Sequence, residues 1–157
     1  MTYLFDTSAL LAHYREEPGW DQVEDLLKTE AVTVCVVSWL EFRIRLAEMT
    51  VDQAEASEAS DIYESLWSRM LPVDRLSVQA AWALRRVVRE RIPLADCLIA
   101  GCAKRHNVTL VHRDAHLAAI PLNVLAAIQL PGLPPLGRGL VKEQGPVYRV
   151  RKLKRKA

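Results

Sequence analysis

Short apolar segments alternate with helical patterns through most of this chain of 157 residues, and this alternation restricts the fold more than any other feature. Five segments are short, apolar and bounded by turn-forming residues, as buried strands are. They are Thr2–Phe5, Val32–Val37, Leu71–Val73, Thr109–Val111 and Leu122–Leu125. Strands that alternate with helices build parallel sheets through crossover connections. The sequence therefore predicts an α/β domain around a mostly parallel central sheet.

Helical spacing of apolar residues predicts the segments that connect these strands. The expected helices cover residues 8–15, 18–28, 38–49, 50–70, 77–90 and 94–106. Four tryptophans fall on the apolar faces of these helices, at Trp20, Trp39, Trp67 and Trp82. We expect them to pack in the core or in a dimer interface, which are the usual places for large aromatic side chains.

A change of texture near Leu130 marks the expected end of the domain. The stretch LPGLPPLGRGL holds three prolines and three glycines in eleven residues, a composition that ends regular structure. The preceding length suits one domain, and 50% hydrophobic with 25% charged residues is typical of globular proteins. We predict a domain over residues 1–128, followed by a linker and basic tail over residues 129–157.

The tail is strongly basic although the whole chain has a net charge of only +2. Residues 142–157 contain seven lysines and arginines against Glu143, which gives +6 and leaves −4 for residues 1–141. Two interpretations stay open at this point. The tail is either a solvated end that aids solubility or an electrostatic arm for a polyanion such as nucleic acid.

The sequence predicts a cytoplasmic protein without a membrane partner. No apolar run approaches the roughly 18 residues that span a bilayer, and the N-terminus lacks the features of a secretory signal. The odd cysteine number, Cys35, Cys97 and Cys102, indicates reduced thiols.

Two aspartates follow predicted strands directly. Asp6 stands at the end of the first strand, and Asp114 lies just past the strand that begins at Thr109. The carboxyl ends of parallel strands share one edge of a sheet, where α/β proteins bind their ligands. The alternative for Asp6 is a helix cap, since Thr7 and Ser8 follow it, and for Asp114 it is a turn residue.

Two further acids are expected at the same edge. Asp96 is the one charge in the apolar decad LADCLIAGCA, a pattern that predicts a buried helix. The alternative is that Asp96 only faces the positive end of its helix. Glu41 follows the second strand within one turn, but Ser38-x-x-Glu41 also matches a capping box.

Four carboxylates at one edge of a sheet would repel one another without a cation. Clusters of oxygen ligands are what hard divalent ions such as Mg²⁺ and Mn²⁺ prefer. The residues therefore predict a divalent metal site formed by Asp6, Glu41, Asp96 and Asp114.

The segments YLFDTSALL, SWLEFRI, LADCLIAGCA and LVHRDAHL resemble, in this order, the signature segments of PIN domains. The match covers about residues 2–125, and the short form resembles VapC-type toxins of toxin–antitoxin pairs. The resemblance implies a three-layer α/β/α fold and a Mg²⁺- or Mn²⁺-dependent endoribonuclease. It further implies a cognate antitoxin, a homodimer and an RNA substrate.

Residue by residue, the resemblance makes Asp6, Glu41, Asp96 and Asp114 the catalytic and metal-binding quartet, with Asp6 and Asp96 as the principal ligands. Thr7, or alternatively Ser8, would assist through its hydroxyl group. His112 is a departure, because many members carry threonine or serine at that place; it would contact a phosphate or weaken a second metal site. The expected RNA contacts are Arg89, Arg113, Lys152, Lys154 and Arg155.

Three other interpretations compete with a nuclease. The first is a non-catalytic module that binds RNA or protein on the same fold. The second is a zinc site drawn from Cys97, Cys102, His106, His112 and His116, although both cysteines have apolar surroundings. The third treats Asp6 as a phosphoacceptor, as in receiver-like or phosphatase domains. The phosphatase form needs a second aspartate two residues after Asp6, where this chain has Ser8.

Overall fold

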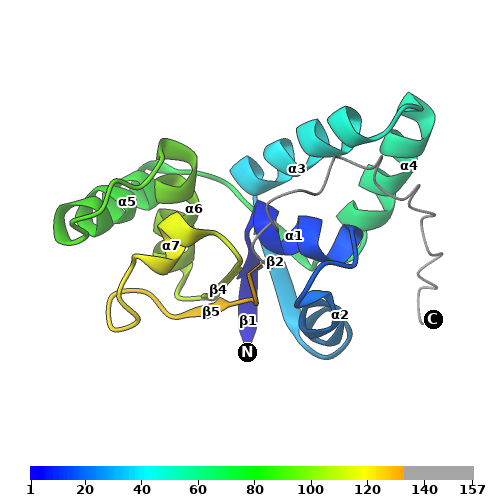
Figure 1. The fold of residues 1–157 in the computed structure, drawn as a ribbon. Coiled ribbons are helices and arrows are strands. Elements are labelled where there is room, and N and C mark those ends of the chain that lie inside the picture. The colour runs from blue at the N-terminus through cyan, green and yellow to red at the C-terminus, as the bar shows by residue number, and fades with distance from the viewer. Residues whose placement is uncertain (133–157) are drawn as a thin grey trace, which may run out of the picture.

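A five-stranded, all-parallel sheet forms the centre of the molecule (Figure 1), and the computed structural model describes residues 1–132. The strands lie in the order β3-β2-β1-β4-β5. Their bounds are β1 Thr2–Phe5, β2 Ala31–Cys35, β3 Arg69–Leu71, β4 Thr109–His112 and β5 Ala127–Gln129. The predicted α/β class with a parallel sheet is confirmed.

Seven helices occur within these 132 residues. They are α1 Thr7–Tyr14, α2 Trp20–Thr29, α3 Val36–Met49, α4 Gln53–Glu64, α5 Arg75–Val87, α6 Leu94–His106 and α7 Ala115–Ala118. Helices α5, α6 and α7 lie on one side of the sheet, whereas α1, α2, α3 and α4 lie on the other (Figure 1). No helix of the described part of the chain is long and apolar enough to cross a membrane.

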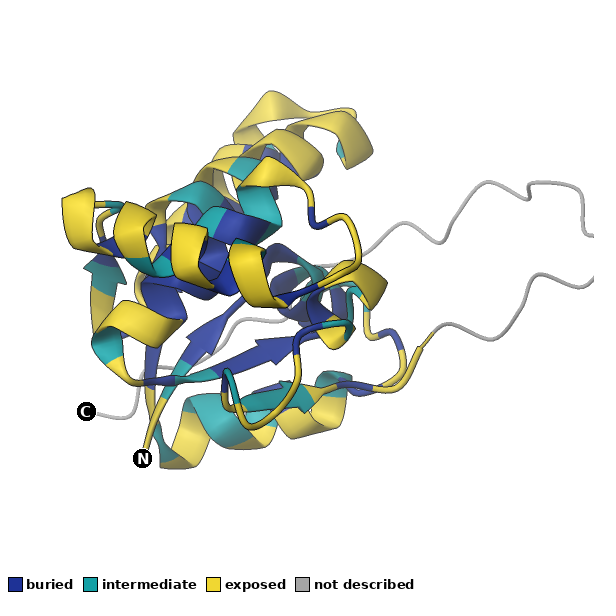
Figure 2. Cartoon of the chain, turned by 90° about the vertical axis from the view of Figure 1, so that its left-hand side faces the viewer, coloured by how far each residue is buried: buried dark blue, intermediate teal, exposed yellow. Residues whose placement is uncertain are grey.

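Two hydrophobic cores on opposite faces of the sheet make the architecture three-layered. Side chains of a strand alternate between the faces. Leu4 accordingly packs in a core with α5 and α6, whereas its neighbour Phe5 packs in the other core with Trp39 and Trp67. The three central strands are largely buried, whereas the edge strands β3 and β5 are partly exposed. Exposed residues gather on the outer surfaces of the helices (Figure 2). The predicted α/β/α layers follow from this alternation.

The structure corrects the last predicted strand. Residues 122–125 form a turn, and the strand β5 begins only at Ala127. The amide groups of Val124 and Leu125 both donate to the Pro121 carbonyl, at 2.8 and 3.1 Å, which closes the turn. Leu125 is buried, so its apolar character reflects an anchor in the core and not a strand.

The long helix predicted over residues 50–70 is also wrong. Helix α4 ends at Glu64, where the Ser65 hydroxyl donates to the Ile62 carbonyl, and β3 follows at Arg69. Trp67 continues the apolar spacing of α4 but is buried after the helix has ended. Helix α7 had no counterpart in the prediction.

The fold continues slightly past the predicted domain boundary at residue 128. Leu130 is buried, and its amide donates to the His112 carbonyl at 2.7 Å. Pro131 then lies against Gly19, whose φ of 93° and lack of a side chain allow this close approach. The predicted basic tail, with Lys152, Lys154 and Arg155, lies outside the described residues.

Candidate active site

Two of the predicted acids stand where neighbouring parallel strands end. Asp6 follows β1 and caps α1, and Asp114 follows β4 and caps α7. The Asp6 amide donates to the Val111 carbonyl at 3.0 Å, which fixes one loop against the other strand. Both acids therefore cap a helix and lie at the carboxyl edge of the sheet, so the two interpretations of each residue do not exclude one another.

Asp6 is a buried carboxylate held by its own helix. Its Oδ2 accepts the Ser8 amide at 3.0 Å and also the Ser8 hydroxyl group. Burial raises the pKa of Asp6 to about 6, although the hydrogen bonds from Ser8 and Thr7 oppose this rise. A buried carboxyl group with this pKa lacks a full counter-charge.

Glu41 is held from the neighbouring helix and not by a capping box. Helix α3 begins at Val36 with Cys35 as its N-cap, so Ser38 lies inside the first turn and the predicted box is wrong. Instead, the Thr7 hydroxyl donates to Glu41 Oε2 at 2.7 Å. This bond links α1 to α3 and directs the Glu41 carboxylate towards the loop that follows β1.

The pKa of Asp96 responds to the charges of the other three acids. It lies in the first turn of α6 and is half-buried. Burial raises the pKa of Asp96 to about 6, and the negative charges of Asp114, Asp6 and Glu41 add to the rise, while His116 opposes it. Asp96 is thus close enough to the other three predicted acids for their charges to act on it.

Ser8 links the start of α1 to the loop after β4 at this edge of the sheet, a contact that the sequence did not indicate. Its hydroxyl donates to Asp6 and accepts the Arg113 amide at 2.8 Å, so it joins α1 to the loop between β4 and α7. Serine two residues after an aspartate is a local cap signal, which explains its bond to Asp6. Its second partner lies 105 residues away and has no local signal.

The predicted RNA contact Arg113 is used inside the protein. Its guanidinium group pairs with Glu17, which also pairs with Arg15 at 2.9 Å, and only 10% of the Arg113 side chain is exposed. One guanidinium nitrogen, Nη1, is buried without a hydrogen-bond partner in the described residues. Arg113 therefore braces the loop that carries Asp114. Arg89, by contrast, is exposed.

His112 is an internal support. It is 1% exposed, and its Nδ1 lies 3.1 Å from the Asp114 carbonyl oxygen. Because a carbonyl only accepts, Nδ1 carries the proton. Burial lowers the pKa of His112 and favours the neutral ring. This placement gives His112 the task of holding the Asp114 loop and removes it from phosphate contact.

The carboxylates fit a hard divalent ion by type and charge, because oxygen donors with uncompensated negative charge are what such an ion binds. They do not form a ready-made cage: within residues 1–132, no group of three Asp, Glu, His or Cys side chains is spaced to hold one metal ion. Within the same residues, the cysteines and histidines of the zinc interpretation form no such group either. Cys97 instead donates to the Ala81 carbonyl, and all three cysteines are buried and free.

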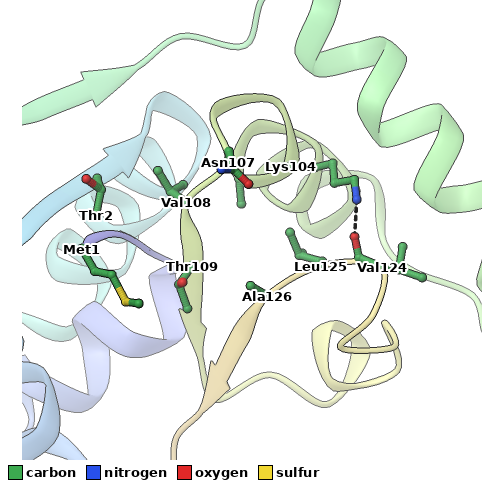
Figure 3. Close-up of a pocket in the computed structure, with 10 residues that line it drawn as sticks. Met1, Thr2, Lys104, Asn107, Val108, Thr109, Val124, Leu125 and Ala126 are labelled. Carbon is green, nitrogen blue, oxygen red and sulfur yellow. Dashed lines mark hydrogen bonds between the residues drawn. The ribbon is translucent and has the colours of Figure 1, made fainter.

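A separate cavity of about 330 Å³ lies at the opposite, amino-terminal edge of the sheet. It opens beside Thr2 and Thr109, the first residues of β1 and β4, and Lys104 crosses it to the Val124 carbonyl (Figure 3). None of the described residues that line this cavity carries a carboxylate side chain. It is therefore distinct from the acidic edge.

The fold is shared with solved structures of low sequence identity. VapBC2 from Rickettsia felis, bound to a DNA fragment from its promoter, matches with a TM-score of 0.69 at 19% identity, over 83% of this chain and 100% of the other. FitAcB from Neisseria gonorrhoeae gives 0.65 at 22%, over 81% and 96%. Mycobacterium tuberculosis VapC20, a sarcin–ricin loop cleaving toxin, gives 0.58 at 17%, over 74% and 93%.

No curated protein matches the sequence. A family model does match, over residues 3–122, a range that contains all four acids and both hydroxyl residues after Asp6. The predicted resemblance is thereby confirmed, and the chain belongs to the PIN domain family.

Proposed function

We propose that this protein is a metal-dependent endoribonuclease and the toxin of a toxin–antitoxin pair. One observation carries the proposal. At the carboxyl edge of a PIN domain sheet, the negative charges of Asp6, Glu41 and Asp114 all help to raise the pKa of Asp96. A solved neighbour of the same fold is described as a toxin that cleaves the sarcin–ricin loop, which favours RNA as substrate.

Each side chain has a defined task in the proposed reaction. Asp6, fixed by Ser8, and Asp96 would be the main ligands of Mg²⁺ or Mn²⁺, with Glu41 and Asp114 completing the set. Such an ion, when bound, activates water and stabilises negative charge on a phosphoryl group. Thr7 keeps Glu41 oriented, and His112 holds the loop of Asp114. None of the four acids acts as a covalent nucleophile.

The test is cleavage of total cellular RNA by the purified full chain, with Mn²⁺, with Mg²⁺ and with EDTA. Discrete fragments should appear with metal and vanish with EDTA. The Asp96→Asn variant should lose at least about 100-fold in cleavage rate, because a principal ligand is missing. Asp61→Asn, an exposed acid on α4, is the matched control and should cleave normally. Full activity in Asp96→Asn would refute the assignment.

A second candidate is a non-catalytic module that binds RNA or protein. One observation favours it: within the described residues, no three acids are placed to hold one metal ion. The same experiment separates the two candidates. Absence of cleavage with every metal, together with RNA binding that Asp96→Asn leaves unchanged, would select the binding module.

We further propose an antitoxin and a second copy of the chain as partners, in the cytoplasm. VapBC-5 from Mycobacterium tuberculosis, a further solved neighbour, is described as a member of a family of toxin–antitoxin systems, and large apolar side chains stay exposed here. Val36, Leu40 and Ile44 lie along one side of α3 at 37%, 62% and 48% exposure. Light scattering should show a dimer, and Leu40→Asp should yield monomers if this side of α3 forms the interface.

A further inference from the structure

Charge is unevenly distributed over the helices of the described chain. All charged residues of helix α4 and its N-cap are acidic: Asp52, Glu55, Glu58, Asp61 and Glu64. The end of α5 and the turn that follows it carry four arginines and one acid between residues 85 and 91. A polyanion would therefore be repelled from α4 and attracted to the turn between α5 and α6.

This turn presents its arginines outward by construction. Val88 and Ile92 are buried, at 4% and 6% exposure, and hold both ends of the turn on the core. Arg89 and Arg91 lie between these two buried residues and are exposed. Arg85 donates to the Val88 carbonyl at 3.0 Å and secures the helix end.

Three of these arginines have guanidinium groups without a partner among the described residues. Arg86, Arg89 and Arg91 are exposed, and their guanidinium groups form no ion pair or hydrogen bond with the described residues. Arg113 differs, since its guanidinium is neutralised by Glu17. We call Arg86, Arg89 and Arg91 the arginine rim.

The arginine rim lies at the same end of α6 as the candidate active site. Helices α5 and α6 pack side by side in opposite directions, with Cys97 against Ala81 and Gly101 against Ser77 (Figure 1). The end of α5 therefore meets the start of α6, where Asp96 occupies the first turn. A strand of nucleic acid bound to the rim would therefore lie at the end of α6 that carries Asp96.

An exposed tryptophan adjoins the rim. Trp82 is 65% exposed and so lies outside the core of this chain, whereas Trp39 and Trp67 are buried in it. The prediction of a core or dimer-interface position leaves only the interface for Trp82. Trp82 precedes Arg86 by one helical turn, so both lie on the same side of α5. Exposed aromatic rings beside cations are how proteins hold unpaired bases, because every base has a face that stacks.

We propose that the arginine rim and Trp82 form a binding surface for single-stranded RNA, with phosphates on Arg86, Arg89 and Arg91 and a base on Trp82. The inference rests on the proposed function and narrows its substrate to unpaired RNA. Bases in a duplex are already stacked on each other and are not available to Trp82, so a duplex gains only the phosphate contacts.

The test measures binding without cleavage. A fluorescent twelve-nucleotide RNA without secondary structure is titrated with the full chain in EDTA at several salt concentrations, by anisotropy. The triple variant Arg86→Ala, Arg89→Ala, Arg91→Ala should bind at least about tenfold more weakly. Its salt slope should fall by about 2, since three phosphate contacts on a single strand contribute about 0.7 each.

A matched triple variant, Arg69→Ala, Arg75→Ala, Arg105→Ala, is the control. These arginines are also exposed, but Arg75 and Arg105 mark the opposite end of the α5–α6 pair. The control should lose less than about threefold in affinity. Equal losses of RNA affinity in the two triple variants would show a general electrostatic attraction and overturn the arginine rim. An unchanged affinity in both variants would also overturn it. Both keep the basic tail, so its contribution cancels.

Trp82→Ala tests the stacking part. It should weaken binding about fivefold with an unchanged salt slope, and a duplex of the same length should bind more weakly than the single strand. Unchanged RNA affinity together with a halved molar mass in light scattering would assign Trp82 to an interface between copies and overturn the stacking. Binding with this pattern but no metal-dependent cleavage would refute the nuclease and leave the rim intact.

Discussion

The two hydroxyl groups that follow Asp6 have different partners, and this division organises the acidic edge. Thr7 holds Glu41, and Ser8 holds Asp6 together with the Arg113 amide. The resemblance to PIN domains indicated that one hydroxyl assists, with Thr7 first. In the structure both residues position carboxylates, from adjacent places on α1.

Ser8→Ala should therefore act on both stability and the site. Loss of the hydroxyl leaves the Arg113 amide without its partner, which costs about 1–2 kcal/mol of unfolding free energy. Ser8→Ala should lower the rate of RNA cleavage more than Ser8→Thr does, because threonine retains the hydroxyl group. Denaturant unfolding and cleavage rates of both variants check this. Equal activity of Ser8→Ala and wild type would mean that the bridge does not position Asp6.

The raised pKa of Asp96 predicts how the metal-free protein responds to pH. The folded-state pKa is about 6, against an ordinary value of 3.8. Between these values the folded state binds more protons than the unfolded state, so stability falls as pH rises through this window. Above pH 6 the ionised carboxylate remains a destabilising charge.

Asp96→Asn removes this charge and should stabilise the metal-free protein at pH 7. We expect a gain of about 1–2 kcal/mol, reduced from the full shift because Asp96 is partly exposed to solvent. The gain should disappear near pH 4, where the wild-type carboxyl is protonated. Thermal melts in EDTA at both pH values measure it. A variant less stable than wild type at pH 7 would contradict the pKa assignment.

At the scale of elements, the close contact between α5 and α6 sets the position of Asp96. Gly101 allows this contact: a Cβ atom there would lie 2.6 Å from the Ser77 carbonyl oxygen and 2.6 Å from the Ala81 Cβ. Both neighbours belong to the buried side of α5, so neither can yield cheaply. The decad LADCLIAGCA is thus a packing surface as well as the carrier of an acid.

Gly101→Ala should destabilise the fold by about 2–3 kcal/mol, because it forces the two helices apart. Gly132→Ala is the control, since among the described residues no atom beyond its chain neighbours lies within 4 Å of a Cβ placed there. Chemical denaturation of the two variants provides the comparison. If Gly101→Ala is as stable as wild type, the helices are less tightly packed than described.

Local patterns predicted some elements well and others poorly, for identifiable reasons. Helix α6 was predicted with its observed bounds, because its apolar pattern begins after Pro93 and ends before Asn107, which adopts a left-handed conformation. Strand β5 was misplaced because Leu122 and Leu125 imitate a strand within a turn closed on Pro121. Such errors arise where buried anchors, and not backbone pairing, explain apolar residues.

At the scale of the whole molecule, strand order brings together acids that are distant in the sequence. Asp6 and Asp114 directly after predicted strands, with Glu41 after the second strand and Asp96 in a buried helix, predicted a common acidic edge. The parallel sheet places β1 and β4 side by side, so Asp6 and Asp114 follow neighbouring strands. The supporting contacts were beyond prediction. Arg113 looked like a free cation, but its pairing with Glu17 depends on how α1 and β4 pack in three dimensions.

The central claim is that these carboxylates bind a divalent metal ion, and calorimetric titration of the metal-free protein with Mn²⁺ tests it most directly. Wild type should bind Mn²⁺ without RNA, Asp61→Asn should match it, and Asp96→Asn should bind at least about tenfold more weakly, since it loses a charged oxygen ligand. Binding that is absent from the wild type, or equal in wild type and Asp96→Asn, would contradict a metal centre at this edge of the sheet.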